Sequence, residues 1–96
     1  MDFCEAIASR RLVEFTYDGH PRVVIPAAYG RHATTGNPVL RAYQIGGTGK
    51  TRAVPFWDLF LLSKIVSAQL AGGTFTDNPP GYKRDDAHIS PIECQL

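Results

Sequence analysis

The chain has 96 residues, a formal net charge of +1 and 44% hydrophobic residues, including five Phe, four Tyr and one Trp. This length suits one domain and the apolar content suffices for a core, which excludes a second independent domain and a wholly disordered chain. No apolar run approaches the roughly 20 residues that a membrane helix needs, and Asp2 stands where a signal peptide carries basic residues, so we expect a cytoplasmic protein.

The beginning of the chain predicts a short helix followed by a strand and a turn. Asp2 and Glu5 have the spacing of a capping box, and the residues around them have one apolar helical face, which predicts a helix over residues 1–10. Apolar and polar residues then alternate over 13–17, the period of a strand with one buried face. Asp18-Gly19 predicts the turn after it.

Two further strands are predicted before the middle of the chain. Residues 22–31 are rich in Val and Ile but contain Pro26 and Gly30, which favours an edge strand or a bent strand. After a turn at 34–37, residues 39–45 read as a strand with two distinct faces. Leu40, Ala42 and Gln44 are expected on one face, and Val39, Arg41, Tyr43 and Ile45 on the other.

The second half begins with a flexible basic loop over residues 46–55, followed by an aromatic strand at 56–62 and another strand at 65–70. Five short strands separated by turns favour a small, strongly bent β-barrel over residues 11–70. Residues 71–96 are expected to form a C-terminal extension that ends in a short strand near residues 89–95. The whole chain, residues 1–96, is then a single domain.

The cysteines and histidines do not predict a disulfide framework or a metal site. Cys4 and Cys94 lie at opposite ends of the chain, so we expect both to be reduced thiols. His20, His32 and His88 lack the spacing of zinc ligands.

Positive charge is concentrated in the middle of the chain. Residues 22–64 contain six basic residues and one acid, a balance of +5, whereas each flank has a balance of −2. A segment with few carboxylates attracts anionic ligands, because nothing nearby cancels its field. A merely solvated basic surface has the same pattern, so both interpretations stay open.

Residues 44–51 end in the Gly-Lys-Thr of a phosphate-binding P-loop, but Gln44 stands where that motif requires Gly. A P-loop also opens a helix, whose N-terminal amides complete the phosphate site, whereas Pro55 and a strand-like stretch follow here. The 45 residues after Thr51 are too few for the sheet and the acidic magnesium ligand of a nucleotide triphosphatase. We therefore interpret this stretch as a flexible basic hairpin loop.

Basic and aromatic residues alternate on the predicted strands. Tyr29 and Arg31 lie two apart, as do Arg41 and Tyr43, so each pair projects from one strand face. Rings that stack on bases beside guanidinium groups that hold phosphates are typical of single-strand nucleic-acid and nucleotide sites. The alternative is that both tyrosines are ordinary barrel aromatics. Trp57, which shares its face with two leucines, is interpreted as a packing residue.

No catalytic constellation accompanies these residues. No serine lies in a GxSxG elbow, no cysteine has a protease-like signature, and no carboxylate pair occupies the basic centre. We therefore do not expect an enzyme.

Short motifs over nearly the whole chain have an order and spacing that resemble a short stand-alone WYL-domain protein. They are Ala6-Ile7, Arg10-Arg11, Phe15-Thr16-Tyr17-Asp18-Gly19, Arg22-Val23-Val24-Ile25-Pro26, Leu40-Arg41-Ala42-Tyr43-Gln44, Trp57-Asp58-Leu59-Phe60, Lys64-Ile65 and Cys94-Gln95-Leu96. The resemblance implies an Sm-like five-stranded β-barrel. Such domains sense ligands in bacterial and phage-defence transcriptional regulators, and some relatives bind single-stranded RNA or DNA.

Several positions depart from the family pattern. The Trp-Tyr-Leu tripeptide corresponds to residues 38–40, where only Leu40 remains, and a His or Tyr that often follows the strand proline is Ala27. A basic residue of the family falls at Asp58, and the Arg of its Arg-Ile pair is Lys64, which lacks the planar fork that grips phosphate at two places. The ligand-binding residues implied by the resemblance are Arg41, Tyr43 and Lys64, with Tyr29 and Arg31 as neighbours.

We therefore expect a regulatory, ligand-binding WYL-like module that binds a nucleotide or single-stranded nucleic acid without a cofactor. The regulators place a winged helix before the barrel, whereas the first twenty residues here form only one short helix, so a role in transcription needs a partner or the barrel surface itself. The alternative is a protein-interaction or homo-oligomerisation module, since small barrels expose strand edges that pair with another chain.

Overall fold

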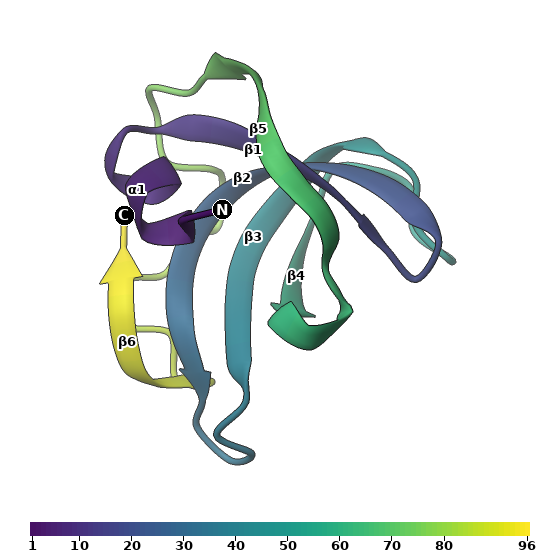
Figure 1. Cartoon of the computed structure of the whole chain (residues 1–96). Helices are drawn as coiled ribbons and strands as arrows, with labels where there is room; N and C mark the ends of the chain where they lie inside the picture. The colour runs from purple at the N-terminus through teal and green to yellow at the C-terminus, as the bar shows by residue number, and fades with distance from the viewer.

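Six antiparallel strands and one short helix make up the computed structural model, which describes residues 1–96 (Figure 1). The elements are α1 (Phe3–Ala8), β1 (Arg11–Tyr17), β2 (His20–His32), β3 (Pro38–Gly47), β4 (Phe56–Leu61), the 3-10 turn η1 (Leu62–Lys64), β5 (Val66–Thr74) and β6 (Ile89–Gln95). The mainly β fold is therefore confirmed. Neither helical segment is long and apolar enough to cross a membrane.

The strands form one sheet in the order β4-β3-β2-β1-β5, and β6 pairs with β2. β2 is long enough to bind two strands along one side, because residues 20–24 pair with β1 and residues 28–32 pair with β6. The predicted five-stranded barrel is wrong because the sheet is not closed. The short strand expected near residues 89–95 is confirmed as β6, which joins the sheet as a sixth strand. Closure needs hydrogen bonds between β4 and β5, but the chain between them forms η1 and leaves both as edge strands.

The sheet is nevertheless strongly bent (Figure 1). In a flat sheet of five strands, the two edge strands would lie about 19 Å apart. Here only residues 62–65, which include a 3-10 turn, join the edge strands β4 and β5, so the bend must bring the two edges closer together. Register shifts between β2 and β3, at Val23–Val24 and at Pro26–Ala28, provide part of the bend. The bend predicted from Pro26 is confirmed, but β2 is a central strand and not an edge strand, because the proline lies at a bulge.

The core fills the inner face of this bend and is covered by α1. Phe60 is fully buried and its ring meets Phe15 and Tyr17 edge-on, with centroid distances of 5.1 and 4.9 Å. The buried members of the cluster are Phe3, Ala6, Ile7, Val13, Phe15, Tyr17, Val24, Leu40, Ala42 and Phe60. The two faces predicted for residues 39–45 are confirmed, because Leu40 and Ala42 belong to this core, whereas Val39 is buried in a separate cluster with Ala28 and Ile89.

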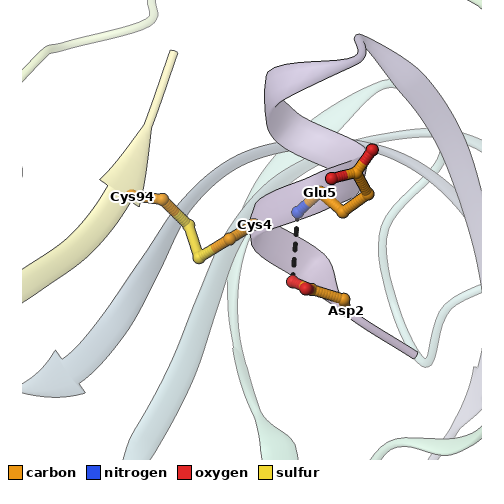
Figure 2. Close-up of a disulfide and its surroundings, with 4 residues drawn as sticks. All are labelled: Asp2, Cys4, Glu5 and Cys94. Carbon is orange, nitrogen blue, oxygen red and sulfur yellow. Dashed lines mark hydrogen bonds between the residues drawn. A yellow bond between two sulfur atoms is a disulfide. The ribbon is translucent and has the colours of Figure 1, made fainter.

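The helix predicted at the start of the chain is confirmed, with Asp2 as its N-cap accepting a hydrogen bond from the Glu5 amide at 3.1 Å. Figure 2 shows that Cys4 on this helix forms a disulfide with Cys94 on β6, with Cα atoms 5.6 Å apart. The expectation of two reduced thiols is therefore wrong. The pairing of β6 with β2, next to α1, brings together two residues 90 positions apart, and no local cysteine spacing reveals that.

Candidate ligand-binding site

A cavity of about 380 Å³ lies over the face of β3 and β4 that is turned away from the core. Arg41 on β3, Trp57 on β4 and the segment 81–88 before β6 line it, and we call it the outer-face cavity. Arg41 projects to this side because its neighbours Leu40 and Ala42 are buried in the core. The volume falls in the range of about 300–1,000 Å³ that is usual for small-molecule sites.

Two aromatic rings, those of Trp57 and Tyr82, line this cavity, and Tyr43, which does not line it, packs against Trp57. Tyr43 and Trp57 are cross-strand partners with ring centroids 5.0 Å apart, and Tyr82 lies 6.4 Å beyond Trp57. The indole Nε1 donates a hydrogen bond of 2.7 Å to the Pro80 carbonyl, which fixes the ring against the C-terminal segment. Gly81 permits this approach, since a Cβ there would lie 3.3 Å from the indole Nε1 and its φ is +80°.

An ion pair joins the strand to the segment that crosses it. Arg41 Nε donates to Asp86 Oδ2 at 2.6 Å, and the Asp86 side chain is only 12% exposed. Burial raises the pKa of Asp86, but hydrogen bonds from Arg41 and from the His88 amide outweigh it and hold the pKa below its ordinary value of 3.8. His88 Nδ1 lies 3.3 Å from Asp86 Oδ1 and 3.4 Å from Arg41 Nη2. Asp86 is therefore a carboxylate at neutral pH and orients the guanidinium.

The segment 82–85 is tied to the end of β6. The Tyr82 hydroxyl donates to the Leu96 carbonyl at 2.8 Å, and the Asp85 amide donates to Gln95 Oε1 at 2.9 Å. Burial raises the pKa of Tyr82 above its ordinary value of 10.0. Arg84 also donates to the Leu96 carbonyl. The remaining cation of the rim is exposed Lys83, which makes no hydrogen bond or ion pair and is free to meet an anion.

The structure brings together only two of the five predicted site residues. Arg41 and Tyr43 lie on the outer face of β3, but only Arg41 lines the cavity, whereas Tyr43 contacts the lining residue Trp57. Tyr29 pairs with Leu40 across β2 and β3, so it lies on the core side, where its ring packs 6.1 Å from Phe3.

The other two predicted residues lie in separate surroundings. Arg31 is exposed at the β2–β3 hairpin and donates to the Gly36 carbonyl at 3.1 Å. Lys64 on η1 pairs with Asp18 at 2.8 Å and lies over the Tyr17 ring, 5.0 Å from its centroid. The positive charge of the central segment is thus divided among several places and does not form one patch.

Sequence reasoning missed the C-terminal half of the cavity. Residues 81–88 have no strand or helix period, so the sequence predicts only an extension there. One signal was present, because Tyr82 is followed directly by Lys83 and Arg84, which repeats the aromatic and basic chemistry of Arg41 and Tyr43. The sequence predicts no strand next to these residues, so it does not show where in the fold they lie.

One hydroxyl group lies within hydrogen-bond distance of a histidine ring: Thr48 Oγ1 is 3.0 Å from His20 Nδ1. No carboxylate forms a hydrogen bond with this ring, as one would in a catalytic triad that orients the histidine as a base. Both cysteines are in the disulfide. No three His, Cys, Asp or Glu side chains gather as metal ligands.

No family model, curated protein or solved structure matches the chain.

Proposed function

We propose that this chain is a ligand-binding module that holds a nucleotide or a short single-stranded nucleic acid in the outer-face cavity. The observation that carries the proposal is the juxtaposition of the Trp57 and Tyr82 rings with the cations Arg41 and Lys83. Aromatic faces stack on bases of any sequence, and basic side chains beside them neutralise phosphates. The proposed role is one of binding and not of catalysis.

The balance of charge around the cavity supports an anionic ligand. Three basic residues and two carboxylates line it, and Asp86 is already engaged by Arg41. Asp85 is engaged by Gln95, whose amide donates to it at 2.9 Å. Lys83 has no such partner, so it is the cation most available to a phosphate.

The resemblance to WYL-domain proteins supports the same class of ligand. A short helix followed by five consecutive strands in one bent antiparallel sheet is compatible with the Sm-like architecture that the resemblance implies. On this proposal the chain acts in regulation through a partner that reads DNA, or through this surface itself. A cytoplasmic location is part of the proposal.

The single tryptophan makes the proposal testable in solution. Titration with adenosine monophosphate and with short oligothymidylate at low salt should quench Trp57 fluorescence, and fluorescence polarisation of a labelled oligonucleotide should give the same affinity. Replacing Tyr82 with Leu removes a stacking face and should weaken binding by about 1–3 kcal/mol. Lys83→Ala should weaken binding to every oligonucleotide sequence alike. It should also reduce the salt slope, which is the slope of the logarithm of the binding constant against the logarithm of the salt concentration, by about 1.

Arg31→Ala is the matched control, because Arg31 is an exposed cation outside the cavity. It should leave both the quenching and the salt slope unchanged. Absence of quenching, or equal losses in the Lys83 and Arg31 variants, would contradict the proposal.

One observation favours a second function, strand addition by another chain. The edge strand β5 pairs with β1 alone, and its Val66 and Leu70 side chains are 57% and 43% exposed. Exposed apolar edge strands are templates for pairing. Light scattering tests this alternative: a stable oligomer that dissociates in a Val66→Lys variant, together with no oligonucleotide affinity, would favour it over ligand binding.

A further inference from the structure

A second recess, of about 150 Å³, lies where the β1–β2 hairpin meets the loop between β3 and β4. Its lining consists of residues 17–18, Arg22, the loop residues 49–52, Phe56 and Asp58, and we call it the Arg22 recess. It shares no lining residue with the outer-face cavity, so the inference below does not depend on the proposed function.

Arg22 is a buried cation without a carboxylate partner. It is 5% exposed, and its two Nη atoms donate to neutral oxygens, those of the Gln44 side chain at 3.0 Å and the Tyr17 backbone at 3.1 Å. Its Nε is buried and makes no hydrogen bond. The guanidinium stays charged at all ordinary pH values. A buried charge is normally paired, so Arg22 is suited to an anionic partner.

The two carboxylates at the recess are already engaged by other cations. Asp18 pairs with Lys64 at 2.8 Å, and Asp58 pairs with Arg52 at 3.2 Å. The hydrogen bond from Lys64 holds the pKa of Asp18 below its ordinary value of 3.8, and the charges of Lys50 and Arg22 contribute to the same effect. Arg22 and Lys50 are left without a carboxylate of their own, and the three basic residues of the lining outnumber its two carboxylates.

The loop over the recess offers unused hydrogen-bond donors. Gln44 Nε2 donates to the carbonyls of Gly46 and Thr48 at 3.0 and 2.9 Å, which holds the start of the loop in place. The amides of residues 49–52 make no hydrogen bond within the chain. Gly49 keeps the opening clear, since a Cβ there would lie 3.4 Å from Arg22 Nη1. This is the Gly-Lys-Thr stretch, which precedes a strand and not the helix of a P-loop.

We propose that the Arg22 recess binds one phosphoryl group, with Arg22, Lys50 and the amides of residues 49–52 as donors. The volume corresponds to about five water molecules, which accommodates a single tetrahedral oxyanion but not a nucleoside. Such a phosphoryl group can come from two sources. One is free inorganic phosphate, and the other is the terminal phosphate of a larger molecule whose remainder lies outside the recess.

The test is a nuclear magnetic resonance titration of the ¹⁵N-labelled full chain with inorganic phosphate, against sodium chloride of equal ionic strength. The expected result is saturable shifts of the amides of residues 49–52 and of the Arg22 Nε–H signal. Lys50→Ala should weaken the affinity at least about tenfold, because hydrogen bonds to charged groups are the stronger class. Gly49→Ala should reduce it as well by narrowing the recess.

Lys50 and Lys83 make a matched pair of exposed lysines, one at each cavity. Lys83→Ala should leave phosphate binding at the Arg22 recess unchanged. A thymidine dinucleotide with a 5′-phosphate, compared with its 5′-hydroxyl form, distinguishes the sources. Tighter binding of the phosphorylated form than of inorganic phosphate assigns a terminal phosphate, and equal or weaker binding assigns the free ion.

No saturable shift at Arg22 Nε with either probe, or wild-type affinity in Lys50→Ala, would overturn the proposal. The two sites fail independently in these measurements. Inorganic phosphate has no base to stack, so it should leave Trp57 fluorescence unchanged even when the Arg22 recess is filled.

Discussion

Reduction of the disulfide between Cys4 and Cys94 should remove a large part of the stability of this domain. The bond joins residues 90 positions apart, so it closes a loop of nearly the whole chain. In the chain-entropy model, cross-linking n residues removes about 2.1 + 1.5R ln n cal/mol/K from the unfolded ensemble, which for this loop is roughly 4.6 kcal/mol at 25 °C. Domains have a free energy of unfolding of about 5–15 kcal/mol. The melting temperature should therefore fall by roughly 20–35 °C on reduction.

Urea unfolding followed by Trp57 fluorescence, with and without reductant, measures this difference on one and the same sequence. A Cys4→Ala, Cys94→Ala double variant is the control, because it should match the reduced wild type and be insensitive to reductant. Equal urea midpoints for the oxidised and reduced protein would refute the reasoning. So would two free thiols in the unreduced protein after unfolding.

Three further predictions concern the fold and the ion pair. Phe60→Ala should lower the free energy of unfolding by about 3–5 kcal/mol in urea titrations, because this ring is fully buried. Gly30→Ala should cost about 1–3 kcal/mol, since its Cβ would lie against the Pro91 carbonyl, whereas Gly72→Ala, which meets open space, should stay within about 0.5 kcal/mol of wild type. The folded pKa of Asp86 lies below its unfolded value, so its contribution to stability is present above about pH 3.8 and is lost as the pH falls through the folded pKa. An Asp86→Asn variant should therefore show a shallower loss of melting temperature over that acid range, and a slope equal to wild type would contradict the assignment.

Local patterns predicted most of the strands correctly. The alternation over residues 13–17 and the Asp18-Gly19 turn correspond to the β1–β2 hairpin, in which Tyr17 pairs with His20. The period of β3 also placed Arg41 and Tyr43 together on the outer face. These features depend only on residues close together in the sequence, because side chains alternate between the two faces of a strand and a short turn fixes how the two strands of a hairpin pair.

The features that the sequence did not reveal depend on long-range pairing. β6 pairs with the second half of β2, more than fifty residues earlier, and this pairing creates both the disulfide and the anchored segment 82–85. The burial of Arg22 was equally hidden, because arginine is rarely buried, even though the strand period places Arg22 on the same face as buried Val24. The strand pattern predicts Tyr29 at a ligand site, but Phe3 on α1 packs against its ring.

The proximity of Cys4 and Cys94 also determines how this domain can be joined to others. The two ends of residues 1–96 lie on the same side of the molecule, beside α1 and β6 (Figure 1). Two proteins fused to the two ends would therefore be held next to each other, at a separation set by the cross-linked pair and not by the width of the sheet. A label or an inserted tag is best placed at the hairpin tip, residues 33–37. These residues are exposed and line neither cavity.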